Sequence, residues 1–435
     1  MSERADPGDR QVSALYLCYW SLLDPLCQSQ SLPYLTRLAA RGHRTILITF
    51  EQPAWRLARE QRRAMQRKLA TAGILWRPLT YHKRPSLVAT AWDCLAGVVV
   101  GSFLVARHCP RVVHSRASVP GAMALALSTL WRRRFLYDAD SRLSLEYADN
   151  GHWRRDSLAF RLTAGVEARC RRRADEIVVL AAPLGDDFRR EGIKVPITVI
   201  PCCVDTSRIR FDGDARGARR RELGLDDEPL FVYVGKTGPR YLIDEMFDFV
   251  RITREELGSG SLFIASGEPA ETFHAIGERH GVNRDVVTVR PVDQADIPGW
   301  LSAADAGLAF IRSTECERGS SPIKIAEYLA AGLPVVITSG IGDLSATVGQ
   351  HRLGAVLGRA DADGYRAAVR TLRQLWAERE ATRDRCRAAC HERLDVDAVG
   401  EARYLAVYDR LAGTPPRPAT FDGTRTGDTL ERVQA

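Results

Sequence analysis

The chain has 435 residues, of which 45% are hydrophobic and 27% charged, so it is long enough for two or three globular domains with separate cores. Its ten cysteines form no Cys-x-x-Cys pair, which argues against a zinc site or a disulfide scaffold and favours a reduced, cytoplasmic protein. The net charge of +8 is uneven, because residues 1–200 contain 31 Lys and Arg against 18 Asp and Glu. This surplus predicts an anionic partner for the first half. Since no aromatic platform or recognition motif accompanies it, we do not expect nucleic acid.

Strands and helices are predicted to alternate along the first half. An apolar strand at 14–19 and a polar loop at 21–31 lead into a helix at 32–41, which Gly42 ends, and a second strand at 45–50. Later segments repeat this order, with helices at 87–107, 121–132 and 157–173 and strands at 111–114, 134–137, 176–180 and 195–200. The alternation predicts a parallel sheet with helices on both faces, and the polar residues 1–12 are expected to be flexible.

Two helices of the first half have unusual compositions. The apolar run at 87–106 contains Asp93 and two glycines, so we expect a helix buried in a folded domain rather than a membrane span. Residues 55–69 place Trp55, Met65 and Leu69 near one face of a helix that is otherwise rich in arginine. Such a helix fits an anionic membrane surface and fits a solvated protein surface equally well.

A charge-rich stretch at 212–228 separates this half from a second alternating series. Its strands are predicted at 230–234, 262–265, 286–289, 306–310 and 335–338, and its last helices at 371–388 and 401–411. The predicted domains are therefore 13–204 and 205–395, with a terminal helix at 396–412 that packs back toward the first domain. Residues 413–435, rich in Pro, Gly, Thr and Arg, are expected to be disordered.

The most informative segment is 320–336, which reads SSPIKIAEYLAAGLPVV. Pro322 suits the first turn of a helix and the two preceding serines suit its cap, while Lys324 and Glu327 lie on one face. A helix N-terminus with a lysine binds phosphate, and a glutamate one turn later can accept hydrogen bonds from ribose hydroxyls. The segment therefore predicts a nucleotide-diphosphate site, although a capped surface helix with an ordinary Lys–Glu pair would look similar.

This segment resembles the C-terminal domain of family 4 glycosyltransferases, which carry a pattern like SPxKxxEYLAxGxPV. Residues 15–50, 113–120, 137–145 and 199–205 also resemble that family, so the likeness runs from about residue 13 to residue 411. It implies an α/β protein of GT-B type, with two Rossmann-like, doubly wound domains that face each other across a donor-binding cleft.

The resemblance implies a retaining transfer of sugar from a nucleotide-diphosphate sugar, UDP- or GDP-linked, to a hydroxyl of a glycan, a lipid-linked sugar or a small molecule. The leaving phosphate would take the proton of the acceptor in a front-face displacement, without a metal or another cofactor. Many members use membrane acceptors, so we expect a cytoplasmic protein that can lie on the inner face of the membrane.

The resemblance and the strand ends together give the candidate residues. Those with a catalytic role are His114, Lys324 and Glu327. Those for the donor are Gly235, Lys236, Arg240, Arg312, Ser320, Ser321, Pro322, Ile323, Lys324 and Glu327. Those on the acceptor side are Asp24, Gln28 and Asp138, with Glu146 nearby, while Gly340, Gly342 and Asp343 are expected to form a turn near the nucleotide or sugar.

The chain departs from the family pattern in two places. Many members have a second glutamate where this chain has Gly319, and Glu317 lies two residues earlier. Many also have an arginine and a lysine after the first strand of the second domain, whereas Lys236 and Arg240 stand here at an unusual spacing. Asp138 and Asp140 have the spacing of a metal motif but follow a strand of the first domain, and we expect no metal site.

Two other functions are also compatible with the sequence. A nucleotide-sugar 2-epimerase of the same fold would share the donor site, but would have no use for a basic first domain. A non-catalytic module that binds a sugar or nucleotide is favoured by Gly319 in place of glutamate.

Overall fold

The computed structural model describes residues 12–82, 84 and 86–413, and the chain divides into two compact units. Unit 1 contains the described residues up to Ile200 and those from Gly400 onward, and unit 2 contains Pro201–Val399. The chain thus leaves unit 1 once and returns to it for its last helix. The predicted boundary near residue 205 lies a few residues beyond the observed one.

Unit 1 is built on a seven-stranded parallel sheet in the order β3-β2-β1-β4-β5-β6-β7. The strands are β1 (Ala14–Leu17), β2 (Thr45–Glu51), β3 (Ile74–Thr80), β4 (Val112–Arg116), β5 (Arg134–Ala139), β6 (Glu176–Val179) and β7 (Ile197–Val199). The central strands are buried along their whole length because helices cover both faces, which is why they read as continuous apolar runs. Only β3 has no counterpart among the predicted strands.

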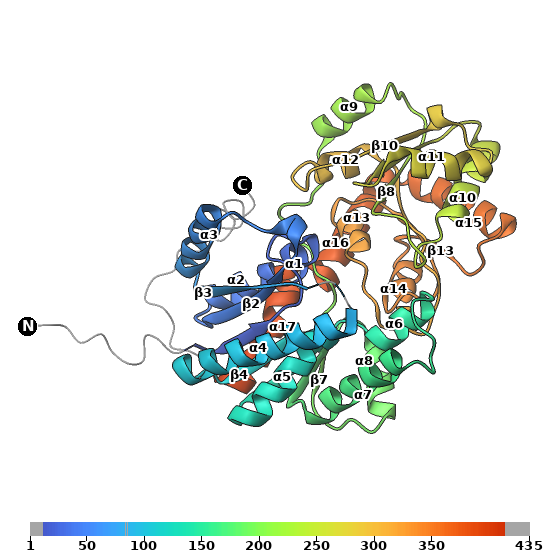
Figure 1. Cartoon of the computed structure of the whole chain (residues 1–435). Helices are drawn as coiled ribbons and strands as arrows, with labels where there is room; N and C mark the ends of the chain where they lie inside the picture. The colour runs from blue at the N-terminus through green and yellow to red at the C-terminus, as the bar shows by residue number, and fades with distance from the viewer. Residues whose placement is uncertain (1–11, 83, 85, 414–435) are drawn as a thin grey trace, which may run out of the picture. The chain divides into compact units, whose positions relative to one another are not determined.

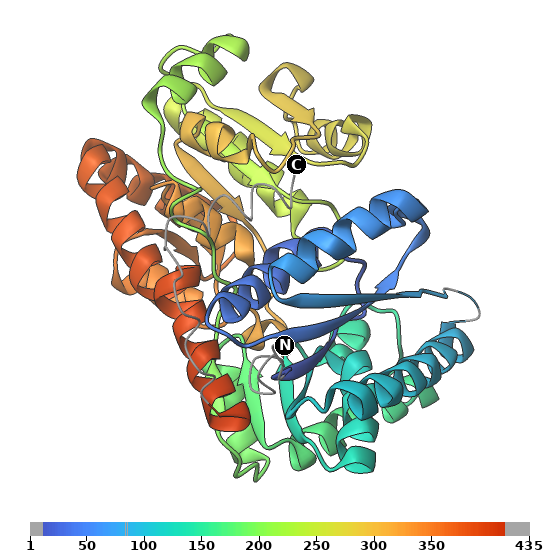
Figure 2. The ribbon, with the colours of Figure 1, turned by 90° about the vertical axis from the view of Figure 1, so that its left-hand side faces the viewer.

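Helices cover the two faces of this sheet with separate cores (Figures 1 and 2). One face carries α4 (Ser86–His108), α5 (Ser118–Trp131), α7 (Leu158–Arg173) and α8 (Ala182–Arg190). The other carries α1 (Pro25–Gln30), α2 (Leu32–Ala40), α3 (Arg59–Thr71) and the last helix, α17 (Ala402–Ala412). A short helix, α6 (Leu143–Asp149), follows β5.

Helix α4 differs from the prediction that it is buried. Its inner face packs closely on α5, because a Cβ atom on Gly97 would lie 2.5 Å from Met123 Sδ and one on Gly101 would lie 2.7 Å from Leu127 Cδ1. The buried Asp93 accepts a hydrogen bond of 2.7 Å from the Tyr19 hydroxyl. Only 33% of the most apolar 18-residue stretch of α4 is buried, because the outer face of the helix is exposed. By length and hydropathy, α4 is the one helix of the described residues that could cross a bilayer.

Unit 2 repeats the architecture with a six-stranded parallel sheet in the order β10-β9-β8-β11-β12-β13. The strands are β8 (Leu230–Val234), β9 (Ser261–Ala265), β10 (Val287–Arg290), β11 (Ala306–Ala309), β12 (Val335–Thr338) and β13 (Gly354–Leu357). One face is covered by α12 (Ile297–Ala303), α13 (Ile323–Ala330), α14 (Leu344–Gln350) and α16 (Arg379–Leu394). The other is covered by α10 (Ile243–Leu257), α11 (Ala270–Arg279) and α15 (Ala362–Ala377), and α9 (Gly213–Glu222) precedes β8.

The strand order of unit 2 places a topological switch point between β8 and β11. The chain runs from β8 toward β9 on one side of the sheet, and from β11 toward β12 on the other. Open parallel sheets bind their ligands beyond the carboxyl ends of the two strands at such a point. The loops after β8 and β11 are therefore where a ligand site belongs in this unit, and the segment 320–336 begins in the second of them.

Candidate functional site

Lys324 lies at the switch point of unit 2, in the first turn of α13. Its side chain is buried, and Nζ lies 4.3 Å from the ring centroid of Tyr233 and 4.3 Å from that of Tyr241. Nζ has no hydrogen-bond partner in the described part of the chain, although a buried ammonium ordinarily has one. The two tyrosine rings hold the cation but leave its N–H groups available to a ligand oxygen.

The surroundings of Lys324 disfavour its charge. Burial and, less strongly, the nearby positive charge of Arg240 together lower its pKa from 10.5 to about 7, against the opposing charge of Glu327. Burial also raises the pKa of Glu327, against the pull of Lys324 and Arg208. The ammonium of Lys324, buried beside the guanidinium of Arg240 and without a hydrogen-bond partner in the described residues, is a place where an anionic group would be stabilised.

Arg240 is held in place by Glu317. Arg240 Nη2 donates to Glu317 Oε2 at 2.8 Å, and Arg240 Nε lies 2.7 Å from Glu317 Oε1. Glu317 is almost fully buried in a short 3-10 helix, Glu317–Gly319, just before the serines of the motif. The carboxylate nearest to the position where many relatives have a second glutamate is thus engaged with an arginine.

The loop after β8 brings backbone close to this cation. Gly235 has φ +150°, and a Cβ atom placed on it would lie 2.7 Å from Lys324 Nζ. The loop is fixed at two further points, because the Tyr233 hydroxyl donates to the carbonyl of Lys236 at 2.7 Å and the amide of Thr237 donates to Glu268 Oε2 at 2.5 Å. Glycine therefore makes room for the lysine side chain at this point.

The motif serines do not cap α13 as predicted. The N-cap is Pro322, which makes no side-chain capping hydrogen bond. Instead, Ser320 Oγ donates to the carbonyl of Glu317 at 3.0 Å, and Ser321 Oγ accepts from the amide of Cys202 at 3.2 Å. The first N–H groups of a helix have no partners within it, so those that begin at Ile323 point beyond the helix end beside Lys324.

The remaining donor candidates surround this core at different distances. Lys236 and Arg312 are exposed, and the backbone amide of Arg312 donates to the carbonyl of Arg240 at 2.9 Å, which ties the loops after β8 and β11 together. The turn after β12 joins them: a Cβ atom on Gly340 would lie 2.3 Å from Ser313 Oγ, and the amide of Gly342 donates to the carbonyl of Glu317. Asp343, which precedes α14, ends this turn.

The first-unit candidates His114 and Asp138 lie in a closed cluster beneath α17, which corrects the expectation that they face a substrate. His114 is 1% exposed, and its Nδ1 lies 2.9 Å from the hydroxyl of Tyr408. Asp138 accepts hydrogen bonds from Arg116 Nη1 at 2.7 Å and from the Tyr404 hydroxyl at 2.6 Å. Burial lowers the pKa of His114. Burial also acts to raise the pKa of Asp138, but Arg116, His114 and Tyr404 together hold that pKa below its usual value.

The other acceptor-side candidates make local contacts in unit 1. Asp24 caps α1 by accepting from the amide of Leu26 at 2.9 Å. Gln28, which is buried, donates to the carbonyl of Leu22 at 2.7 Å. Glu146 accepts from the Ser141 hydroxyl at 3.0 Å. Asp24 and Gln28 therefore stabilise the loop after β1.

Asp140 stands out from these residues at the carboxyl end of β5. One of its oxygens is buried without a hydrogen-bond partner in the described residues. Burial raises its pKa to about 7, and the charges of Asp138 and Glu146 add to the shift against the opposing charge of Arg116. Its side chain is partly exposed, unlike that of Asp138. Among the described residues no group of three or more His, Cys, Asp or Glu could hold a metal ion, Asp138 and Asp140 included.

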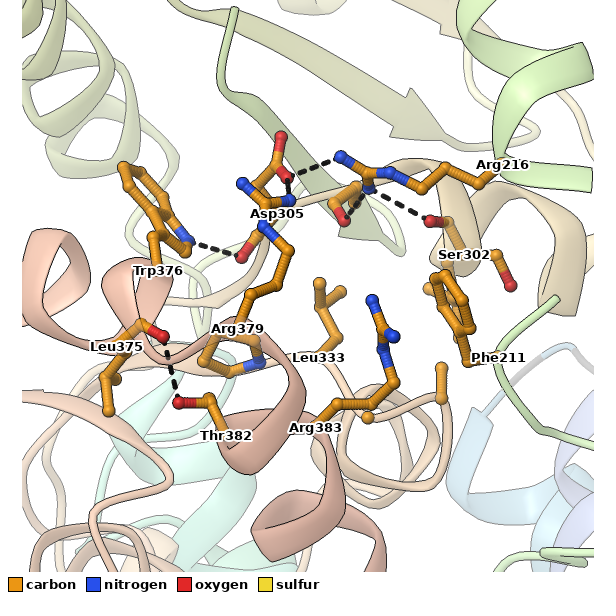
Figure 3. A pocket seen from close by; sticks show the side chains of 15 residues that line it. Phe211, Arg216, Ser302, Asp305, Leu333, Leu375, Trp376, Arg379, Thr382 and Arg383 are labelled. Atoms are coloured by element: carbon orange, nitrogen blue, oxygen red, sulfur yellow. Dashed lines mark hydrogen bonds and ion pairs between the residues drawn. The ribbon is translucent and has the colours of Figure 1, made fainter. Parts of the chain in front are cut away.

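A pocket of unit 2 lies away from Lys324, at the opposite, amino-terminal end of the strands (Figure 3). Asp305, just before β11, accepts from Arg216 Nη2 at 2.8 Å and from the backbone amide of Leu230 at 2.9 Å, and it pairs with Arg379. Arg383 stacks on Phe211 across the pocket, with its guanidinium carbon 3.4 Å from the ring centroid. These contacts join α9, α16 and two strands, so we assign the cluster to the framework of the unit.

Sequence reasoning missed the two tyrosines that hold Lys324. Tyr233 is an inward residue of β8, and Tyr241 follows Arg240 in the loop. Neither carries a motif, and both lie more than 80 residues from Lys324 in the sequence. Their position on either side of the glycine loop was the only signal available.

Comparison with known proteins gives family matches in both units. A family model described as glycosyl transferases group 1 matches residues 228–374, and one described as a glycosyl transferase 4-like domain matches residues 31–203. The chain is 30% identical over 181 residues to a GDP-mannose-dependent alpha-(1-6)-phosphatidylinositol monomannoside mannosyltransferase of Mycolicibacterium smegmatis, covering 41% of this chain and 47% of that protein. It is 32% identical over 178 residues to D-inositol 3-phosphate glycosyltransferase 2 of Catenulispora acidiphila, covering 38% and 40%. The matched part thus spans less than half of each curated relative.

Solved structures agree on the fold at low sequence identity. Sucrose-phosphate synthase from Thermosynechococcus elongatus superposes with a TM-score of 0.69 at 16% identity, covering 92% of this chain and 99% of that one. WaaG, a glycosyltransferase involved in lipopolysaccharide biosynthesis, gives 0.66 at 17% identity, covering 92% and 100%. Anabaena HepE in complex with UDP gives 0.66 at 14% identity, also covering 92% and 100%. The two parallel sheets of this chain therefore form a GT-B fold.

Proposed function

Because the chain belongs to the group 1 glycosyl transferases, with one matched family domain in each unit, we propose that it transfers a sugar from a nucleotide-diphosphate sugar to an acceptor hydroxyl. The observation that carries the proposal is the unpartnered, buried ammonium of Lys324 at the switch point of the matched C-terminal domain. A donor diphosphate would supply the anion that this cation lacks, with Arg240 beside it. Glu327, one turn further along α13, would receive the ribose hydroxyls.

We propose that transfer retains the configuration at the sugar carbon and requires no metal. The bond between the sugar carbon and the diphosphate oxygen breaks as the acceptor oxygen bonds to the same face. The acceptor proton passes to the leaving phosphate. Lys324 and Arg240 would stabilise the charge that develops on that phosphate, and the N–H groups at the start of α13 would help them.

We place the acceptor site of unit 1 at the carboxyl edge of its sheet, with Asp140 in place of the buried Asp138 and His114. Asp140 is partly exposed at the end of β5, whereas Asp138 and His114 are buried. A carboxyl group with a pKa near 7 can accept a hydrogen bond from an acceptor hydroxyl over the physiological range. The two curated relatives are named for phosphatidylinositol monomannoside and for inositol 3-phosphate, and one of them for GDP-mannose, which favours an inositol-containing acceptor and a GDP-linked donor. Anabaena HepE, which shares the fold, was solved with UDP, so a UDP-linked donor is the alternative. We also propose that the protein works in the cytoplasm as a peripheral protein of the membrane.

The first test is the binding of nucleotides to the purified chain. UDP, GDP, ADP and dTDP are compared by thermal shift and by calorimetry in wild type, Lys324→Met and Glu327→Gln. We expect one nucleotide to raise the melting temperature of wild type, and both variants to lose most of that shift. Cooperative unfolding with no shift from any nucleotide would contradict the donor site. Binding of a nucleotide without turnover of any sugar donor would favour a non-catalytic module, and the comparisons do not favour the epimerase.

A further inference from the structure

The outer face of α4 exposes a continuous apolar stripe. Val88, Trp92, Leu95, Val99 and Phe103 follow one another at intervals of three or four residues, and each is between 55% and 67% exposed. This spacing places them along one side of the helix over roughly 22 Å. Most exposed apolar residues in proteins stand singly, whereas a long contiguous patch marks a surface that something covers.

The helices beside α4 expose apolar residues and arginines but keep their carboxylates inside. The only acid of α4, Asp93, is fully buried, and α5 has none. In α7, Glu167 is buried and accepts from the hydroxyls of Ser118 and Ser144, while Leu158 and Leu162 are exposed. This face of unit 1, formed by α4, α5 and α7, therefore presents no exposed acidic side chain from its three helices.

Arginines border the stripe where α4 and α5 end. Arg107 lies in the last turn of α4, and Arg132 and Arg133 follow α5. Arg111, Arg132, Arg133 and Arg134 line one open pocket there, with Asp175 as its only acidic residue. Arginine side chains at the edge of an apolar surface can reach phosphate groups while the apolar residues insert between lipids.

We infer that the outer face of α4, with the arginines at its end, is the surface through which this protein lies on a membrane containing anionic lipids. The inference rests on the proposed peripheral association and names the part of the chain responsible, which is α4 rather than the basic helix α3. The helix lies on the bilayer and does not span it, because Gly97, Gly101 and Asp93 hold its inner face in the core of unit 1. A second copy of the chain fits this surface less well, because the arginines of the two copies would lie close together and repel each other.

Flotation of the full chain with lipid vesicles tests the surface. We expect the chain to float with vesicles of phosphatidylglycerol and phosphatidylcholine in equal parts, and less with phosphatidylcholine alone. The variant Leu95→Gln/Val99→Gln/Phe103→Gln should bind at least about tenfold more weakly. The matched control is Leu26→Gln, which changes a 41% exposed leucine of α1 over the other face of the same sheet and should float like wild type. Melting temperature and the nucleotide-induced shift verify that both variants are folded.

Quenching by brominated lipid locates the contact. Trp92 on α4 is 58% exposed, and Trp55, just before the basic helix α3, is 37% exposed. Trp92→Phe keeps the surface apolar, so it should float normally but lose the quenching seen in wild type, whereas Trp55→Phe should keep it. Flotation that the triple substitution leaves unchanged, or quenching that depends on Trp55, would overturn the inference.

Two further results separate this inference from the proposed transferase. A chain that does not float, but forms a dimer that the triple substitution abolishes, would show that a second copy covers the stripe and would overturn the inference. A chain that floats by α4 and binds no nucleotide would sustain this surface while contradicting the proposed donor site.

Discussion

A Cβ atom on Gly235 would lie 2.7 Å from the Nζ atom of Lys324, so the lysine occupies space that only a glycine leaves free. Gly235 lies in the loop after β8, and Lys324 lies in the first turn of α13, which follows the loop after β11 on the other side of the switch point. Their closeness makes the charge state and the position of one side chain depend on the backbone of the other loop.

Gly235→Ala should weaken nucleotide binding by about tenfold or more, because the added methyl group displaces the ammonium. Gly238→Ala is the matched control: Gly238 has a similar φ of +140°, but its Cβ would meet nothing within 4 Å. Calorimetric titration with the preferred nucleotide measures both. Equal losses in the two variants would show that backbone strain, and not the approach to Lys324, causes the effect.

Lys324→Met should stabilise the protein while abolishing nucleotide binding, since methionine fills the tyrosine cage without a buried charge. We expect a gain of roughly 1–3 kcal/mol in the free energy of unfolding. Because the pKa of Lys324 falls from 10.5 to about 7 on folding, its contribution to stability rises with pH between those values. Denaturant unfolding at several pH values should show that slope in wild type and a smaller one in the variant.

Binding of a nucleoside diphosphate should draw in a proton above neutral pH. Free Lys324 is largely neutral at about pH 8, and the diphosphate favours its charged form, so binding raises its pKa. Calorimetry in two buffers of different ionisation enthalpy measures the uptake, which should approach one proton at about pH 8 and decline toward pH 6. Arg240→Ala should raise the pKa of free Lys324 and so reduce the uptake at about pH 8, whereas an unchanged uptake would show that Arg240 does not lower that pKa.

Arg116→Met should destabilise unit 1 by about 3–5 kcal/mol, because it leaves Asp138 buried without its cation. Arg134→Met is the control, since the ion pair of Arg134 with Asp175 is largely exposed and should contribute under about 1 kcal/mol. Thermal or urea unfolding compares them. Similar losses from both would mean that the buried pair contributes no more than a surface pair.

His114→Gln should lower the melting temperature and leave nucleotide affinity unchanged, because His114 contacts Tyr408 in a closed cluster. Asp140→Asn should have the opposite effect: it should lower turnover by about 10²-fold or more and leave the melting temperature unchanged. A fall in turnover with unaltered stability in His114→Gln would restore the predicted catalytic role of that histidine.

The sequence alone predicts much of unit 2, because helix α13 carries its motif in consecutive residues. The segment 320–336 places Lys324 and Glu327 on one short helix, and the structure has them there. The tyrosine cage could not be predicted in the same way. Tyr233 and Tyr241 approach Lys324 only because β8 and β11 are neighbours in the sheet. The order of strands in a sheet cannot be predicted from a local sequence pattern.

Unit 1 shows where strand patterns mislead. His114 and Asp138 end predicted strands, which places them near a ligand edge, but α17 returns from the far end of the chain and covers them. Likewise, the composition of α4 identifies an apolar helix but does not show which face of that helix packs against the core of unit 1. The spacing of Gly97 and Gly101, four residues apart, was the available signal for its inner face.

The return of the chain to unit 1 through α17 has a consequence for synthesis. Unit 2 is one unbroken segment and can close its core as soon as residue 399 has left the ribosome. Unit 1 begins earlier, yet Tyr404 and Tyr408 must arrive before the buried charges of Asp138 and Arg116 are covered. We therefore expect unit 2, which is translated second, to fold first. Until α17 is synthesised, Asp138 and Arg116 of unit 1 stay hydrated.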